Sequence, residues 1–344
     1  MADFNINHIT GKQGQQGTVL AGVTTVSSTG AMRIPSGPTE QRGVRGRGII
    51  AGSYVTNTTL INKIEIATTG NATSFGALGS AHGWSYPSAS STRAVFAGGY
   101  VSGTAIITAI DYVTIPSGGG GNDFGDLSTG FKQGAGFSDS TRGIFATGAK
   151  TSPSPVISEI NFITIASTGS VSSFGDALVA RRGAKGLASP TRGVFAQGGT
   201  LESPATSATN VIEYVTIQSK GNSVEFGDRT STHTFQGAAA SNTTRGLLAG
   251  GYTAPANSNI IDYITIATTG NASDFGDLTS ARHGGGGMSS ATRAVFGGLW
   301  DGAADETMDY VTIASTGNAT DFGDATVAIY YSDCASDSHG GLGD

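Results

Sequence analysis

Three short sequence blocks recur in the same order six times along this chain. The first block reads TRAVFAGG from Thr92 and TRGVFAQG from Thr191, and its weakest copy is GRGIIAG from Gly46. Its arginines, 46 to 53 residues apart, are Arg47, Arg93, Arg142, Arg192, Arg245 and Arg293. A repeat of this length constrains the fold strongly, because each copy must form one structural unit that packs on its neighbours.

The second and third blocks follow each arginine at a variable distance. The second block reads IDYVTI from Ile110 and IDYITI from Ile261, with INKIEI from Ile61 as its divergent first copy. The third block carries a Phe-Gly step whose glycines are Gly76, Gly125, Gly175, Gly227, Gly276 and Gly323. All three blocks keep step through six copies, so chance similarity does not explain them.

Each repeat has the pattern of four β-strands. The VFA and VTI runs are rich in β-branched and aromatic residues, and TTGN or STGN turn signals follow them. A weaker strand precedes each arginine, as in ARHGGGGMSS from Ala281. We therefore predict an all-β fold, a six-bladed β-propeller with four strands in each blade. The predicted blades lie near residues 46–78, 81–127, 130–177, 180–229, 232–278 and 281–325.

The two ends of the repeat region predict how the ring closes. No segment before Gly46 matches the first strand of a blade, whereas AIYYSDCAS from Ala328 matches it after the last repeat. We expect residues 328–339 to supply the missing strand of blade 1, so the propeller domain spans residues 46–344. Residues 1–45 carry no repeat block, and we expect them to form an extended N-terminal arm.

Composition argues against several other classes of protein. The 54 glycines follow no three-residue period and there are only 9 prolines, so the chain is not collagen-like. A net charge of −6 argues against a nucleic-acid partner. The single cysteine, Cys334, leaves no internal disulfide and no cysteine-based zinc site. Because no apolar run reaches about 18 residues, we expect no membrane insertion, and we expect no secretory signal.

The order of residues within each repeat resembles that of kelch repeats. Gly98 and Gly99 match the kelch double glycine, Tyr112 matches the kelch tyrosine, and Phe124 stands where kelch repeats have tryptophan. The gap between tyrosine and the second aromatic residue is also longer than in kelch repeats. The resemblance covers residues 46–339 and implies a kelch-like β-propeller. It implies little about function, because propellers serve many functions.

A second resemblance concerns bacteriophage structural proteins. The stretch STGAMRIPSGPTEQR, residues 28–42, resembles a segment of phage virion proteins. The repeats are similar to those in structural proteins of tailed phages that infect marine bacteria, such as cyanophages. This resemblance implies a virion protein on the tail or capsid surface. It also implies that residues 1–45 dock onto other virion proteins, with several symmetric copies in the particle.

The function that we expect from this resemblance is non-enzymatic. The first expectation is a tail-fibre or receptor-binding component that contacts a glycan or protein on the host surface. A decoration protein or structural appendage without a receptor is one alternative, and a carbohydrate-active propeller enzyme is another. No repeat carries an evident catalytic constellation, so we predict no catalytic residues and no cofactor.

Variation between the repeats points to one face of the predicted propeller. The turn between the third and fourth strands is nearly constant, whereas the segment between the second and third strands differs in every copy. Variable loops on a rigid scaffold are common recognition sites. The candidate recognition residues in these loops are Tyr54, Tyr100, Tyr252 and Trp300. These rings can stack on sugars or hold a protein partner, or each ring can simply cap its own blade.

The repeated arginines and the histidines are further candidates. The arginines form either an anion-binding ring or structural pairs with strand-end carbonyls or with the aspartates of the third block, Asp126, Asp176, Asp228, Asp277 and Asp324. Because blade 1 has Ala77 in place of the aspartate, Arg47 should be the least constrained arginine. His82, His233 and His283 fall on different blades without metal-ligand spacing, so we predict no metal site.

Overall fold

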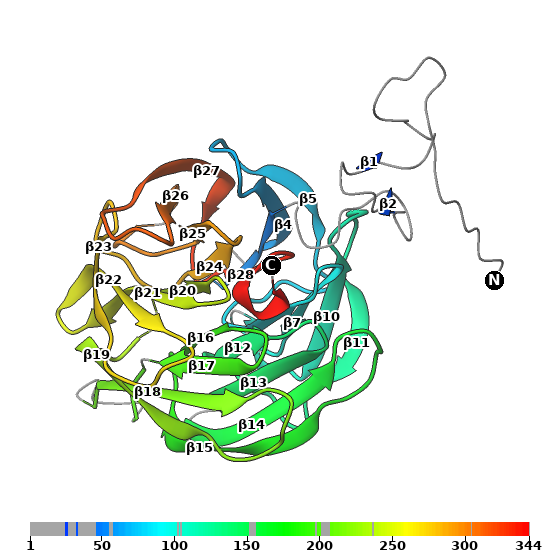
Figure 1. Cartoon of the computed structure of the whole chain (residues 1–344). Coiled ribbons are helices and arrows are strands. Elements are labelled where there is room, and N and C mark those ends of the chain that lie inside the picture. Colours follow the sequence, from blue (N-terminus) through cyan, green and yellow to red (C-terminus); the bar gives the residue numbers. More distant parts are fainter. Residues whose placement is uncertain are drawn as a thin grey trace. The chain divides into compact units, whose positions relative to one another are not determined.

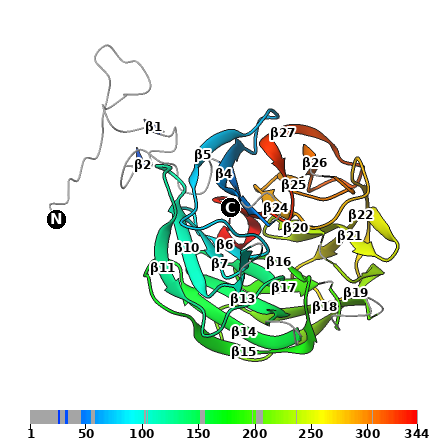
Figure 2. The ribbon, with the colours of Figure 1, turned by 180° about the vertical axis from the view of Figure 1, so that it is seen from behind.

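The computed structural model describes residues 25–26, 32–33 and 46–343, apart from 55–57, 102, 104, 151–155, 197, 201–206, 236 and 304. Six four-stranded sheets stand around a central axis as the blades of a propeller (Figure 1). Figure 2 shows the same ring from behind. The predicted all-β, six-bladed propeller is therefore confirmed.

Within each blade, antiparallel strands follow one another outward from the axis. Blade 1 contains β28 (Asp333–Ser336), β3 (Arg47–Ser53), β4 (Thr58–Glu65) and β5 (Thr73–Ala77). Blade 2 contains β6 (Tyr86–Ala89), β7 (Arg93–Ala97), β10 (Ala109–Thr114) and β11 (Asn122–Asp126), with the small hairpin β8 (Tyr100–Val101) and β9 (Ala105–Ile106) between β7 and β10. Blade 3 contains β12 (Ala135–Ser138), β13 (Arg142–Ala149), β14 (Val156–Thr164) and β15 (Ser172–Arg181).

The other three blades repeat this order. Blade 4 contains β16 (Lys185–Ala188), β17 (Arg192–Ala196), β18 (Thr209–Thr216) and β19 (Val224–His233). Blade 5 contains β20 (Ala238–Ser241), β21 (Arg245–Thr253), β22 (Ala256–Thr265) and β23 (Ser273–Asp277). Blade 6 contains β24 (Gly286–Ser289), β25 (Arg293–Gly297), β26 (Asp305–Thr312) and β27 (Thr320–Ile329).

The ring closes through the C-terminal strand, as the sequence predicts. Strand β28 pairs with β3, with Cys334 opposite Ile50 and Ala335 opposite Ile49. The closing strand itself is shorter than residues 328–339, because the chain up to Ile329 still belongs to β27 of blade 6. Blade 1 thus combines strands from the two ends of the propeller domain, so no blade at the seam lacks its inner strand.

The hydrophobic core is divided among the interfaces between blades. In the described part of the chain, each of six buried clusters joins two successive blades. At the seam, for example, Ile50 and Ile64 of blade 1 pack with Met288 and Phe322 of blade 6. Alternate residues of each strand face opposite neighbours, so a blade is buried on both sides and depends on both neighbouring blades.

The repeated arginines are structural, and they link neighbouring blades. Arg93 of blade 2 donates from Nη1 to the carbonyl of Ile165 in blade 3, at 3.0 Å. The corresponding pairs are Arg47 with Ile115, Arg142 with Ile217, Arg192 with Ile266, Arg245 with Ile313, and Arg293 with Ile66. Strand-end carbonyls, rather than the aspartates of the third block, are therefore the partners seen in the described residues.

An aromatic residue of the same blade holds each of five arginines in place. The Arg93 guanidinium lies over the Tyr112 ring, 4.6 Å from its centroid. Tyr112 in turn meets Phe124 edge to face, with the ring centroids 6.0 Å apart. Blade 1 has Lys63 at the tyrosine position, and there Arg47 forms an ion pair with Glu65 at 3.3 Å. Arg47 is 8% exposed, so the expectation that it would be the least constrained arginine is wrong.

The glycine of the third block permits a close approach between blades. An ideal Cβ at Gly125 would lie 2.5 Å from the carbonyl oxygen of Gly169, in the turn between the third and fourth strands of the next blade. The side-chain oxygen of Asn222, in the same turn of blade 4, accepts a hydrogen bond from the backbone N–H of Asp176 at 3.0 Å. The constant turn sequence is therefore explained by its contact with the preceding blade.

The propeller has two different faces. We call the side with the variable loops and the connections between blades the loop face, and the other side the turn face. Inner strands of all six blades surround a central cavity of about 60 Å³. The C-terminal 3-10 helix η1 (Gly340–Leu342) lies at its turn-face end, where His339 Nε2 is 2.9 Å from the carbonyl of Ala89. Figures 1 and 2 both show the C-terminus at the centre of the ring.

The predicted N-terminal arm, residues 1–45, lies almost wholly outside the described residues. Within it, β1 (Thr25–Val26) and β2 (Met32–Arg33) pair antiparallel. The predicted docking of this segment onto other virion proteins therefore stays a prediction.

Candidate recognition face

The four predicted recognition residues all lie on the loop face, and each is partly exposed. Single β-bridges connect three of them to the segment that leads into the inner strand of a blade. Tyr100 bridges to Gly83, Tyr252 to Phe235 and Trp300 to His283. These bridges hold the base of each variable loop against the start of an inner strand, close to the propeller axis.

The rings of blades 1 and 2 form one cluster. Tyr54 stacks on Trp84 with ring centroids 4.0 Å apart and an interplanar angle of 16°. Tyr54 also contacts Tyr100 at 5.4 Å, and Trp84 contacts Tyr331 at 5.0 Å. Because these contacts cross from one blade to the next, the alternative in which each ring caps only its own blade does not hold here.

Tyr331 connects this cluster with the rings of blades 5 and 6. Its ring centroid lies 5.6 Å from His283 and 5.2 Å from Tyr330. His283 contacts Tyr252 at 5.2 Å, and Tyr330 contacts Trp300 at 4.4 Å. The structure therefore joins the four predicted residues in a single network. We call this network the aromatic arc, which comprises Tyr54, Trp84, Tyr100, Phe235, Tyr252, His283, Trp300, Tyr330 and Tyr331.

Two cations flank the ends of the aromatic arc. Lys132 Nζ lies 4.7 Å from the centroid of the Tyr100 ring and 5.8 Å from that of Trp84. Arg182 Cζ lies 5.0 Å from the centroid of Phe235. Lys132 and Arg182 occupy the same repeat position on successive blades, so the loop face carries rings on one side and cationic groups beside them.

Sequence reasoning missed five members of the arc, and a positional signal could have found two of them. Trp84 and Tyr331 occupy one repeat position, two residues before an inner strand. We call the ring of these positions the channel mouth, and its described members are Trp84, Gln133, Gly183, Gly284 and Tyr331. Blades 4 and 6 have glycine at this position. An alignment of the repeats would therefore show Trp84 and Tyr331 as bulky residues at a position where other copies have glycine.

Three side chains at the channel mouth sit on strained backbone. The φ angles are 59° at Trp84, 60° at Gln133 and 54° at Tyr331, whereas glycine fills the equivalent position in blades 4 and 6. A left-handed conformation costs a residue with a side chain about 1–2 kcal/mol. Strain of this kind is concentrated at functional sites, so its repetition around one opening is a functional signal.

Backbone hydrogen bonds tie the mouth positions to one another. The N–H of Trp84 donates to the carbonyl of Tyr331 at 3.3 Å, and the N–H of Gln133 donates to the carbonyl of Trp84 at 3.0 Å. The N–H of Gly183 then donates to the carbonyl of Gln133 at 2.5 Å. Four successive blades are therefore linked around the axis, which fixes the relative positions of the backbone at the mouth.

Hydrogen bonds fix the tautomer of His283 beside Tyr331. His283 Nδ1 is 2.8 Å from Asn257 Oδ1, while Asn257 Nδ2 donates to the carbonyl of Trp300. His283 therefore donates from Nδ1, and its Nε2 accepts from the Tyr331 hydroxyl at 3.1 Å. Burial lowers the pKa of His283 to about 4 and raises the pKa of Tyr331 to about 12, so both side chains are neutral near pH 7. A Cβ at Gly284 would lie 2.2 Å from the Tyr331 ring, so only glycine leaves room for it.

Several polar atoms at and below the mouth have no hydrogen-bond partner within the described residues. They are Trp84 Nε1, Gln133 Oε1, Ser332 Oγ and Asp333 Oδ1. The other oxygen of Asp333 accepts from the backbone N–H and the hydroxyl of Ser85, both at 2.8 Å. Burial raises the pKa of Asp333 to about 6. Such atoms also occur elsewhere in the described blades, and in proteins they usually bind water or a ligand.

Lys185 and Cys334 line the central cavity below the mouth. Lys185 belongs to blade 4 and Asp333 to blade 1, which face each other across a six-bladed ring. Burial lowers the pKa of the Lys185 ammonium, and Asp333 opposes that change. Burial raises the pKa of Cys334 to about 12, so its thiol is not a nucleophile near neutral pH.

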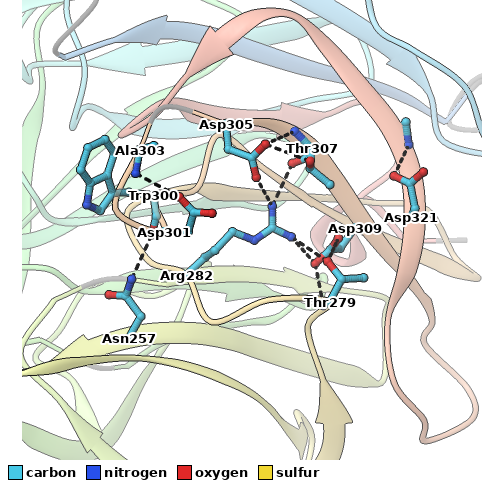
Figure 3. Close-up of polar contacts among 11 residues, drawn as sticks. Asn257, Thr279, Arg282, Trp300, Asp301, Ala303, Asp305, Thr307, Asp309 and Asp321 are labelled. Carbon is cyan, nitrogen blue, oxygen red and sulfur yellow. Dashed lines mark hydrogen bonds and ion pairs between the residues drawn. The ribbon is translucent and has the colours of Figure 1, made fainter.

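Buried ion pairs outside the mouth are structural. Figure 3 shows Arg282 between Asp305 and Asp309. Arg282 Nη1 lies 3.1 Å from Asp305 Oδ2. Asp309 is fully buried, and it also accepts hydrogen bonds from Thr279. Arg181 pairs with Glu213 in the same way. Each pair fastens the end of one blade to the third strand of the next, a role that the sequence did not reveal.

The histidines do not form a metal site in the part of the chain that the structure describes. Burial lowers the pKa of His82 to about 4, and burial together with the Arg229 charge lowers that of His233 to about 3. No group of three or more metal-ligating side chains comes together among the described residues.

Two further findings bear on identity. No helix in the described residues has both the length and the apolar character needed to cross a membrane. No protein-family model matches the chain, and no curated protein matches it.

Proposed function

We propose that this protein is a non-enzymatic virion surface protein, a tail-fibre or receptor-binding component that recognises the host through its loop face. The observation that supports recognition is the aromatic arc, a connected set of partly exposed rings contributed by variable loops and blade connections. Aromatic clusters on a rigid scaffold are well suited to binding, since rings offer large contact areas with little side-chain entropy to lose. The virion location comes from the sequence resemblance.

Binding to cells tests the recognition role. Full-length fluorescent protein should bind some strains in a panel of marine bacteria, and a double variant Tyr54→Ala/Tyr100→Ala should bind at least tenfold less. Val224→Ala is the matched control, because Val224 is 53% exposed and begins strand β19 at the turn face. Equal binding by the double variant and the control would refute recognition through the arc and favour a decoration protein.

The virion location needs a separate experiment. Antibodies against residues 46–344 should label purified phage particles under the electron microscope. Label at the tail or its fibres supports the receptor-binding role, and label on the capsid supports the decoration alternative. Particles without label would overturn the virion assignment altogether.

The enzyme alternative is weaker, because glycosidases use two carboxyl groups that face each other across the scissile bond. Asp333, next to the channel mouth, is a buried carboxyl group, and the charge that acts on it most is the Lys185 ammonium rather than a second carboxylate. Incubation of the protein with envelope polysaccharide should therefore release no reducing sugar. Release that survives dialysis and disappears in an Asp333→Asn variant would support the enzyme instead.

A further inference from the structure

We propose that the channel mouth, at the centre of the loop face, binds one uncharged pyranose ring, the terminal sugar of a surface glycan. This inference rests on the proposed recognition function and narrows it to one site and one class of ligand. The site comprises Trp84 and Tyr331 as ring surfaces, with Gln133, Ser332 and Asp333 as polar partners.

The first line of support is that strain and unpaired polar atoms coincide. Trp84 and Gln133 both have left-handed φ angles, and each also buries a polar side-chain atom without a partner. Glycine at these positions would remove both penalties, and blades 4 and 6 do have glycine there. A sequence that keeps two unfavourable features at the same residues indicates that those side chains serve something other than stability.

The second line of support is the chemistry of the unpaired atoms. Trp84 Nε1 can only donate, Gln133 Oε1 can only accept, and the hydroxyl of Ser332 can do both. Gln133 is 3% exposed and Asp333 is 2% exposed, so neither can rely on bulk water. Sugar hydroxyls both donate and accept, so a single sugar ring can satisfy this mixture.

The rings and charges of the site select the same class of ligand. The faces of a pyranose carry C–H groups that pack on aromatic rings. The mouth offers the rings of Trp84 and Tyr331, whose centroids lie 5.0 Å apart. Binding pockets for small ligands combine such apolar surfaces with a few well-placed polar groups. The two buried charged groups nearby, Lys185 and Asp333, are of opposite sign and interact with each other, which favours an uncharged, hydroxylated ligand over an ionic one.

Binding requires a side-chain movement at the mouth, because the unpaired atoms are buried. We expect Tyr331 to turn, which breaks the hydrogen bond between its hydroxyl and His283. Rotamer changes of this size are common when ligands bind.

Tryptophan fluorescence gives a direct readout. The chain has two tryptophans, Trp84 and Trp300, and both belong to the aromatic arc. In a Trp300→Phe variant of the full chain, Trp84 is the sole reporter. Titration with methyl glycosides of glucose, galactose, mannose and N-acetylglucosamine should give a saturable change for at least one sugar, in the millimolar range. Sorbitol is the matched control, because it has the hydroxyls of a hexose but no ring face.

Two variants test the assigned residues, with saturation-transfer NMR as the readout. Trp84→Phe keeps a ring but removes the N–H, and Gln133→Gly places glycine where blades 4 and 6 already have it. Each should weaken sugar binding at least fivefold. Gln133→Gly should also unfold at the same temperature as the original chain or higher, a combination that a purely structural role for Gln133 does not produce.

The outcomes separate this proposal from the proposed function. Cell binding without a saturable response to any of the four sugars overturns the sugar site and leaves host recognition standing, with water as the partner of the unpaired atoms. Sugar binding that both variants retain in full overturns the assignment to the mouth. Absence of both cell binding and sugar binding defeats the two proposals together.

Discussion

Arg293 Nη1 donates a hydrogen bond of 2.9 Å to the carbonyl of Ile66, across the seam between the last blade and the first. The same guanidinium lies 4.4 Å from the centroid of the Tyr310 ring in its own blade. The five other repeated arginines make the equivalent link to the next blade, so Arg293 completes a ring of interblade hydrogen bonds.

Replacement of Arg293 should therefore destabilise the whole propeller. Arg293→Met keeps the length of the side chain but removes the charged donor, and we expect the free energy of unfolding to fall by about 1–2 kcal/mol. Arg293→Lys should recover only part of the loss, because an ammonium cannot present the planar stack that Tyr310 contacts. Chemical denaturation measures both. An Arg293→Met protein as stable as the original would show that the seam does not need this link.

The closing strand should matter more than the helix that follows it. A chain that ends at residue 330 lacks β28, which leaves β3 unpaired on its inner edge and removes Cys334 and Ala335 from the core. We expect this shortened chain to aggregate or to melt at least 10 °C lower, since the loss of a whole strand removes a large part of the roughly 5–15 kcal/mol that stabilise a typical domain. Thermal unfolding followed by circular dichroism is the measurement.

A second truncation serves as the control. A chain that ends at residue 338 keeps β28 but lacks His339 and η1, so it should remain a cooperatively folded propeller. If the two truncated chains behave alike, the C-terminal helix rather than strand pairing is what holds the seam.

The fold was predictable because its information is repeated. Three blocks in six copies determine the strands, the number of blades and the C-terminal closure, and each copy supports the others. The partners of the repeated arginines were only partly predictable, since the sequence did not decide between strand-end carbonyls and aspartates as the acceptors. Arg47 was mispredicted because the sequence shows that Ala77 replaces an aspartate but not that Glu65 and the next blade supply other partners.

The candidate site was predictable only in part. Loop variability placed Tyr54 and Tyr252 on one face, but sequence alone does not show that Tyr331, from the closing segment, joins their blades. Trp84 escaped notice because it lies in a connection between blades, where neither strand pattern nor turn chemistry defines its position. Its left-handed φ angle of 59° is a feature of the folded backbone that strand and turn patterns do not reveal.

The buried ion pair of Arg282 and Asp309 leads to a further prediction, and the seam of the same propeller supplies the control for it. Asp309→Asn alone should lower the free energy of unfolding by about 3–5 kcal/mol, because it leaves a buried guanidinium without its countercharge. At the seam, the equivalent positions are Ile329 and Asn62, and Asn62 accepts from Thr326 as Asp309 accepts from Thr279. The double variant Arg282→Ile/Asp309→Asn reproduces that arrangement and should recover most of the lost stability. Urea denaturation of the original chain and the two variants measures the three free energies of unfolding. A double variant no more stable than Asp309→Asn would contradict the equivalence of the two positions.

His283 should make the loop face sensitive to acid. Its pKa falls from 6.5 to about 4 on folding, so between these values the unfolded chain binds more protons than the folded chain. The contribution of His283 to the free energy of unfolding is therefore constant above pH 6.5. The free energy of unfolding then decreases as the pH falls from 6.5 towards 4. Protonation of Nε2 also removes the acceptor for the Tyr331 hydroxyl.

Comparison of the original chain with His283→Gln isolates this effect. Gln does not titrate, yet its side-chain carbonyl can still accept from Tyr331. Asp333 and Asp337, whose pKa values burial raises to about 6, act in the opposite direction, but they are present in both proteins and cancel in the difference. Between pH 7 and pH 4.5 the original chain should lose about 1–3 kcal/mol more than the variant, measured by denaturation at each pH. Parallel pH profiles for the two proteins would show that His283 stays uncharged throughout or is solvated when it is protonated, and the link to Tyr331 would then contribute nothing to acid sensitivity.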